Sequence, residues 1–368
     1  MGSHSGVFRG GGDFQRDVRA LVASTLSPDD VRRGRRRFHI KAAIIIAWAL
    51  ASYVFLVWFS AGWIGMVLGT VSMALALGGI GFSIQHDANH GAVGRRSRIL
   101  GYSLDLVGVS SYFWRERHNH LHHTFTNVVD ADGDIDQLPF ARLAPDQRWM
   151  WNHQAQHIYM WVLYGMYALK TIVTGDAISI AMGTRHTSSP TPRPRGKRLT
   201  GFLIAKVLFI TWALVIPFIF RPWWQVLIAD FVVLWLLGIL LAVVFQLAHC
   251  VEEASFTSIS RMHESDEPVE WARHQVETTA DFAPGNPLVT WYLGGLNFQI
   301  EHHLFSNVCH VHYPTLAPGL REVCERHGVT YAVHPTLRSA LASHGRWLKA
   351  MGQRPVSPMG HGGGIPTT

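Results

Sequence analysis

The sequence predicts an all-helical integral membrane protein with four membrane-spanning helices, additional interfacial helices and a helical cap on one membrane face. Composition is the first reason: 48% of the 368 residues are hydrophobic and only 15% are charged, whereas soluble domains carry about 25% charged residues. The second reason is a pair of long apolar blocks, and the third is a set of histidine clusters that follow them.

The two apolar blocks predict the four spans. Residues 42–85 contain no Asp, Glu, Lys or Arg, and one helical crossing needs roughly 20 apolar residues. Ser60–Trp63 favours a turn in this block, and Arg221-Pro222 interrupts the second block, residues 199–248. The expected spans are about 42–60, 63–85, 199–220 and 224–248.

We expect these spans to belong to one domain, residues 38–352. A polar, basic segment, residues 1–37, precedes it, and the Gly- and Pro-rich residues 353–368 are predicted to be a disordered tail. Two shorter apolar stretches, Ile99–Phe113 and Ile158–Val173, each contain a charged residue and are expected to lie along the membrane interface.

Basic residues predict the orientation. Six Arg and Lys side chains lie within 32–41, three within 95–98 and five within 185–198, whereas the two outer hairpins contain only Arg221. The positive-inside rule therefore puts both termini and the middle segment in the cytoplasm, with a bacterial inner membrane as the expected location. No nucleic-acid-binding motif accompanies the formal charge of +7, so nucleic acid is not an expected partner.

Asp230 lies inside the fourth expected span. A carboxylate in a span is a functional candidate. Trp223 and Trp224 mark a nearby membrane interface, so a side chain that faces the interface is the favoured interpretation.

Two histidine clusters flank the middle of the chain. His86 and His90 follow the second span at i, i+4 spacing, which brings both rings to one helix face. In the run His118–His123, α-helical geometry groups the first histidine with His122, turns His123 about 140° away and turns His120 to nearly the opposite side. The predicted metal-binding trio is therefore His118, His122 and His123.

Two further positions, after the fourth span and near residue 300, also carry histidines. His302 and His303 diverge by about 100° on a helix and suit two different metal ions. Gln299 lies one turn earlier and is either a weak ligand or a supporting group, and His249 closes the fourth span. Asp87 and Asn89, between the first two histidines, are also expected to support the ligands.

An even number of crossings separates these places, so all of them are expected at the cytoplasmic face. They offer more imidazoles than one ion coordinates, which implies two metal ions. Imidazole suits iron, and cysteine is absent from these positions, which disfavours a thiolate zinc site or an iron–sulfur cluster. The predicted ligands are His86, His90, His118, His122, His123, His249, His302 and His303.

Asp130, Asp132, Asp134 and Asp136 alternate after the second cluster. A calcium loop of the EF-hand type requires glycine where Ile135 stands. The carboxylates are therefore expected to orient nearby histidines or to keep a loop solvated.

The clusters HDANH (86–90), HNHLHH (118–123) and QIEHH (299–303) resemble the three histidine boxes of membrane-bound fatty acid desaturases. A third box that begins with Gln is typical of the front-end branch, which includes delta-6 enzymes. The surrounding segments WRERHNHLHHTFTN, FQLAHCVEEA, GGLNFQIEHHLFSNVCHVHYP and HGRWLKAMG are similar to those of cyanobacterial, linoleoyl-type delta-6 desaturases. The likeness covers roughly residues 35–352.

The resemblance implies an oxidoreductase with two iron ions that uses O2 and two electrons to insert a cis double bond into an acyl chain. The box histidines would be iron ligands, and His249 matches a further ligand position of the family. Direct coordination by Gln299 stays open, because many relatives have histidine there. The fatty acyl substrate could be bound to lipid, coenzyme A or acyl carrier protein.

Electron supply is a further expectation. The sequence has no N-terminal haem-binding domain with an HPGG motif, so a separate electron donor such as ferredoxin is expected. An acyl hydroxylase or acetylenase on the same scaffold is the main alternative. A histidine-rich metal transporter or haem electron carrier is a remote one, because such proteins hold their histidines near the middle of the membrane.

Overall fold

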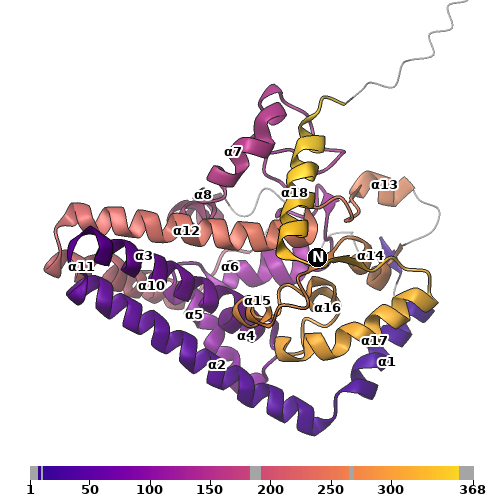
Figure 1. Cartoon of the computed structure of the whole chain (residues 1–368), viewed down its shortest axis with the longest axis horizontal. Coiled ribbons are helices and arrows are strands. Elements are labelled where there is room, and N and C mark those ends of the chain that lie inside the picture. The colour runs from indigo at the N-terminus through magenta and orange to yellow at the C-terminus, as the bar shows by residue number, and fades with distance from the viewer. Residues whose placement is uncertain (1–6, 10, 183–191, 265–268, 356–368) are drawn as a thin grey trace, which may run out of the picture.

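Four helical segments dominate the computed structural model, which describes residues 7–9, 11–182, 192–264 and 269–355. Among these residues, four segments are long and apolar enough to cross a membrane, with mean hydropathies from 1.8 to 2.8. They are Pro28–Phe59, Gly62–His90, Lys197–Phe220 and Trp223–His249. Most other elements are also helical (Figure 1), so the predicted all-helical membrane fold is confirmed.

Three of the four segments change helix type along their length. The first consists of α2 (Pro28–Val54) and the π-helical η1 (Phe55–Phe59), and the second of α3 (Gly62–Gly79), the π-helical η2 (Ile80–Gln85) and α4 (His86–His90). The third consists of α10 (Lys197–Ile210), the π-helical η7 (Thr211–Val215) and α11 (Ile216–Phe220), and the fourth is α12 alone (Trp223–His249). Short π-helical turns of this kind occur frequently at functional sites.

Shorter helices connect and cap these segments. α1 (Asp13–Thr25) precedes the first. Between the second and third lie η3 (Arg95–Tyr102), α5 (Ser103–Leu106), α6 (Ser111–Arg115), η4 (Glu116–His122), η5 (Trp151–Ala155), α7 (Gln156–Leu163), α8 (Met166–Lys170), η6 (Thr171–Gly175) and α9 (Asp176–Met182). After the fourth lie α13 (Ile259–Glu264), α14 (Trp271–Glu277), α15 (Pro287–Tyr292), α16 (Gln299–Leu304), η8 (His310–His312), α17 (Tyr313–Arg326) and α18 (Leu337–Gly352).

The strands of the described residues form short parallel pairs. β1 (Phe8–Arg9) pairs with β4 (Val269–Glu270), β2 (Val128–Val129) with β3 (Thr257–Ser258), and β5 (Ala280–Phe282) with β6 (Ala332–His334). They tie distant parts of the chain together but build no extended sheet.

Local chemistry sets where the spans begin. Ser27 Oγ accepts a hydrogen bond from Asp30 N, and the Asp30 carboxylate accepts one from Ser27 N, so a capping box opens α2 directly before Pro28. Gly62 has a φ of +59° at the turn into α3, a conformation that a residue with a Cβ atom adopts only under strain. Pro222 is the N-cap residue of α12, and its nitrogen carries no hydrogen to donate to a preceding helical turn.

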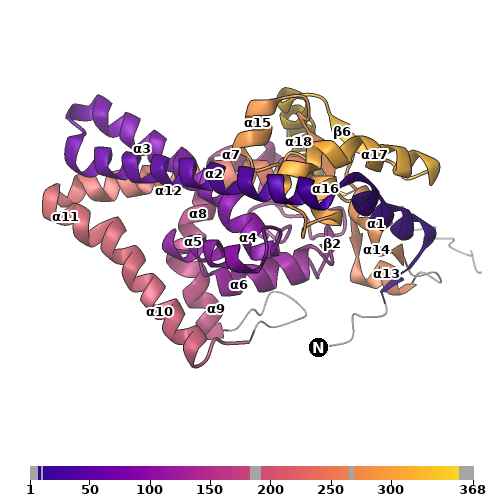
Figure 2. The same ribbon diagram turned by 90° about the horizontal axis from the view of Figure 1, so that it is seen from below.

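α2, α3 and α12 form the packed part of the membrane region, whereas α10 splays away from them (Figure 2). Ile45 of α2, Leu77 of α3 and Leu237 of α12 belong to one buried apolar core. None of the residues of α10 is buried. The three packed helices therefore form a rigid base on which other elements are held.

A helical cap lies beyond one end of this base (Figure 1). α1, α14, α16 and α17 share an apolar core that includes Phe14, Val276, Ile300 and Leu320. α18 packs against α7 and α12. This packing returns the C-terminal third of the chain to the ends of the spans, where the earlier histidines lie.

Asp230 occupies a different place from the expected one. It lines an apolar cavity of about 260 Å³ together with Tyr53 and Trp212. Its Oδ2 atom is buried and has no hydrogen-bond partner among the described residues. The carboxylate therefore faces the interior of the splayed bundle, because α10 leaves an apolar space beside α12.

The two predicted terminal segments are described in part. Residues 1–37 include α1 and the start of α2, and α1 packs on α17. α18 ends at Gly352, and residues 356–368 of the predicted tail lie outside the described residues.

The backbones of α8 and α12 approach closely at Gly165 and Gly238. A Cβ atom at Gly238 would lie 2.3 Å from the Gly165 carbonyl oxygen. We expect Gly238→Ala to destabilise the protein by about 1–3 kcal/mol through overpacking and to lower the midpoint of thermal unfolding in detergent. Gly201→Ala is the matched control, since no atom lies within 4 Å of the added Cβ there; equal midpoints for both variants would contradict the close packing.

Candidate metal centre

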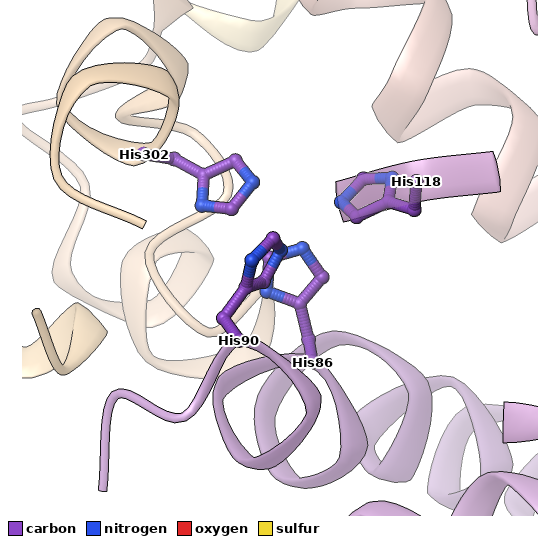
Figure 3. Close-up of side chains that lie close together, drawn as sticks. All are labelled: His86, His90, His118 and His302. Carbon is purple, nitrogen blue, oxygen red and sulfur yellow. The ribbon is translucent and has the colours of Figure 1, made fainter. Parts of the chain in front are cut away.

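The first histidine group joins the end of the second span, η4 and the cap. His86 and His90 project from α4 toward His118 and His302 (Figure 3). Side-chain nitrogens of these four histidines all lie within 4.8 Å of one another. α4 ends directly afterwards at Gly91, whose φ of +79° closes the helix in the left-handed conformation. Two residues of one helical turn thus meet one from η4 and one from α16.

A second group lies beside the first. His122, His249 and His303 bring one nitrogen each within 4.8 Å of one another, and His123 does the same with His302 and His303. The structure therefore brings all eight predicted histidines together in one buried cluster. His120 is exposed and belongs to none of these groups.

The second box reaches this arrangement through a π-helix, which the sequence did not reveal. His123 N donates to His118 O at 3.1 Å, the i+5 pattern of the π-helical η4. The Nε2 atoms of these two histidines lie 3.3 Å apart. The predicted separation of about 140° between them is wrong, because it assumed an α-helix.

Hydrogen bonds fix the orientation of several rings. His303 Nδ1 lies 2.8 Å from Gln275 Oε1, and His122 Nδ1 lies 3.1 Å from Asp132 Oδ2. His302 Nδ1 lies 3.4 Å from Tyr313 Oη. A ring that donates through Nδ1 presents the lone pair of its Nε2 atom to the other side.

The Nε2 atoms of the rings show whether metal ions fit the site. The Nε2 atoms of His90, His122, His302 and His303 are buried and have no hydrogen-bond partner among the described residues. Buried polar atoms without partners are rare in proteins. Several such atoms that converge within ligand distance of one another fit the donor set of metal ions.

Burial also suits these rings for coordination. It lowers the pKa of His118, His123, His302 and His303 well below the usual value, and the neighbouring imidazoles lower it further. The rings are therefore neutral at pH 7, as a metal-binding imidazole must be.

His122 behaves differently. Burial lowers its pKa, but the Asp132 carboxylate outweighs burial, so the pKa is raised. The same negative charge that favours a proton on this ring also favours a metal cation there. Asp132 additionally accepts hydrogen bonds from Asn127 N and Asp134 N. Of the two roles expected for the alternating carboxylates, Asp132 has the orienting one.

The predicted supporting residues link α4 to its surroundings. Asp87 Oδ2 accepts hydrogen bonds from His310 N at 3.1 Å and from His310 Nδ1 at 2.8 Å, and Lys41 Nζ lies 3.1 Å from the other ring nitrogen. Asn89 Oδ1 accepts from Arg115 at 2.9 Å. These contacts hold α4 in a defined rotation.

Gln299 is buried as the first residue of α16. Its direct coordination of a metal stays a prediction.

Inside the third box, Glu301 points away from the histidines into a polar network. Tyr331 Oη donates to Asp281 Oδ2 at 2.5 Å or to Glu301 Oε1 at 2.7 Å, and Asp281 Oδ1 accepts from Ile300 N at 3.0 Å. Burial raises the pKa of Asp281 to about 6 and that of Glu301 well above its usual value. The network anchors the first turn of α16, from which His302 and His303 extend.

Comparison with known proteins identifies the family. Residues 61–335 match the family model described as fatty acid desaturase. The chain belongs to the fatty acid desaturase family. It is therefore an oxidoreductase of fatty acid metabolism, as the histidine boxes predicted.

Several relatives resemble this desaturase along most of its length. It is 36% identical over 349 residues to the sn-1 linoleoyl-lipid 6-desaturase of Arthrospira platensis, covering 93% of each chain. It is 35% identical over 329 residues to the protein of the same name from Synechocystis sp., covering 88% of this chain and 90% of the relative. It is 37% identical over 327 residues to an acyl-lipid (8-3)-desaturase of Physcomitrium patens, covering 85% of this chain and 66% of the relative.

Sequence reasoning missed Gln275, Tyr313 and Tyr331. None of them lies in a histidine box, and no spacing rule connects them to one. Their positions depend on how α14, α16 and α17 pack in the cap.

Gln275 provides a test of the metal-binding arrangement. We expect Gln275→Leu to weaken metal affinity by about 10–100-fold, because His303 loses the nearer acceptor of its Nδ1–H and keeps only Thr126 Oγ1 at 3.2 Å. Chelator competition on purified protein measures this affinity. Gln275→Glu keeps an acceptor oxygen and is expected to retain the affinity; an equal loss in both variants would contradict the orienting role.

Proposed function

We propose that this desaturase inserts a cis double bond into a lipid-linked acyl chain on the carboxyl side of an existing double bond, using two iron ions. The observation that carries the proposal is the cluster of eight histidines, five of which have a buried ring nitrogen with no hydrogen-bond partner among the described residues. Removal of hydrogen from an unactivated methylene requires a strong oxidant, which two bound iron ions would supply from O2 and two electrons.

The histidine groups suggest how the two ions would be held. One ion would be held by His86, His90, His118 and His302, which form one group. The other would be held by His122, His249 and His303, with His123 next to the shared histidines of the third box. Asp132 and Gln275 would hold two of these rings with Nε2 directed inward.

The relatives support the position of the new double bond. Two of them are named linoleoyl-lipid 6-desaturases, and a third is an acyl-lipid (8-3)-desaturase. We extend the lipid-linked substrate and the front-end position from them to this chain. The third box, QIEHH, supports the same assignment through its first residue.

The remaining parts of the proposal concern location and electrons. The basic residues next to the spans support a cytoplasmic position for the histidine cluster and both termini, in a bacterial inner membrane. Electrons would come from a separate carrier such as ferredoxin.

Expression in a host that lacks this activity tests the reaction. In cells supplied with linoleate, we expect a new trienoic acid with a double bond at carbon 6, identified by mass spectrometry of the lipids. The variant His303→Ala is the inactive control. Hydroxylated or triple-bonded products alone would overturn desaturation in favour of hydroxylation or acetylenation.

The second box offers a test that does not depend on activity. His120→Ala is expected to keep the full iron content, because its ring is exposed and outside the cluster. His122→Ala is expected to lose bound iron, because it removes a buried ring from the second group. Elemental analysis of the purified variants measures iron per chain, and loss of iron in His120→Ala would refute the assignment.

A further inference from the structure

A cationic pocket lies apart from the histidine cluster. It has a volume of about 500 Å³ and is formed where α6 and η4 face the segment that leads into α10. Its charged and aromatic lining residues are Tyr112, Glu116, Arg193, Arg195, Lys197 and Arg198. Four cations against one carboxylate give this pocket a positive charge at pH 7.

Contacts with α6 hold one wall of the pocket in place. Tyr112 Oη donates to Pro192 O at 2.8 Å, and the Arg198 guanidinium lies 5.5 Å from the centre of the Tyr112 ring. Arg193 donates to Ala181 O. Thus a segment outside any helix is tied both to α6 and to the end of α9.

The cations of this pocket are not paired with its one carboxylate, Glu116. Among the described residues, none of the four takes part in an ion pair, although exposed Arg and Lys elsewhere in the chain do. Charges of one sign gathered around a pocket favour an anion, and the Arg guanidinium matches phosphate geometry.

The position of the pocket restricts which anion fits. Lys197 and Arg198 of the pocket are the first residues of α10, and α10 begins at the end of its span away from α11 (Figure 2). Basic residues at the end of a membrane span lie next to the lipid headgroups. A phosphate attached to a lipid is therefore already at the depth of these side chains.

The distance to the histidine cluster supports the same occupant. Tyr112 and His118 lie on the continuous helical segment formed by α6 and η4, so at most about 9 Å of helix axis separates them. A front-end desaturase acts close to the carboxyl end of its substrate, where few bonds separate the reacting carbons from the glycerol ester. The headgroup of an acyl lipid must then lie near the reacting carbons, as this pocket does.

We propose that this pocket binds the phosphate of an anionic glycerophospholipid and so positions the acyl-lipid substrate for desaturation. The proposal rests on the proposed acyl-lipid desaturase function and adds the class of headgroup. Arg195 and Lys197 are the cations whose removal tests it, because both are exposed and neither is held by Tyr112.

Lipid binding is measured on full-length protein in mixed micelles with phosphatidylglycerol as the probe, by native mass spectrometry. Arg195→Gln/Lys197→Gln is expected to weaken retention about 30-fold, since each basic side chain near an anionic headgroup contributes about 1 kcal/mol. Arg95→Gln/Arg96→Gln is the matched control, because it removes two exposed cations outside the pocket. Equal retention in both double variants would overturn the proposal.

Two competitors distinguish the possible sources of phosphate. Inorganic phosphate or coenzyme A should leave phosphatidylglycerol bound at equal concentration; displacement by either one would assign the pocket to a soluble phosphate and overturn a lipid headgroup site. Binding is separable from catalysis in this design. Wild-type protein that retains the lipid but makes no unsaturated product would refute the proposed reaction and leave the pocket assignment standing.

Discussion

The structure depends on one constraint: eight imidazole rings must be gathered within ligand distance of one another in the interior of the protein. Burial of a polar ring is costly unless its nitrogens have partners. Hydrogen bonds satisfy Nδ1 of His122 and His303 from the protein side and leave the inner nitrogens for metal ions. The packing of the cap serves this requirement, because it brings Gln275 and Tyr313 to the Nδ1 atoms of His303 and His302.

The membrane helices contribute a fixed frame. α2, α3 and α12 pack tightly, and α3 and α12 lead directly into His86, His90 and His249. α10 is spared from this packing and remains splayed. The part of the membrane region that carries ligands is thus the rigid part, whereas the loosely packed helix borders the apolar cavity at Asp230 and begins at the cationic pocket.

The sequence was sufficient for the spans and for the members of the histidine cluster. The uncharged run from residue 42 to 85 is long enough for two membrane crossings. Histidines separated by an even number of crossings lie at the same face of the membrane. The sequence was insufficient for the π-helical geometry of η4. An α-helix and a π-helix differ in the hydrogen-bond spacing of the backbone, and composition does not reveal that spacing. The orienting roles of Gln275 and Tyr331 and the inward position of Asp230 arise from contacts between segments far apart in the chain, which periodicity does not encode.

The π-helical turn at 116–122 has a consequence for how this enzyme can change during evolution. In a regular helix, loss of a residue on one surface shifts its neighbours by about 100°. Here, the five-residue spacing of His118 and His123 lies on one face only while the turn stays π-helical. A return to α-helical hydrogen bonding at the same length would turn His123 about 140° away from His118. The spacing of the second box and the helix type of this turn therefore have to change together.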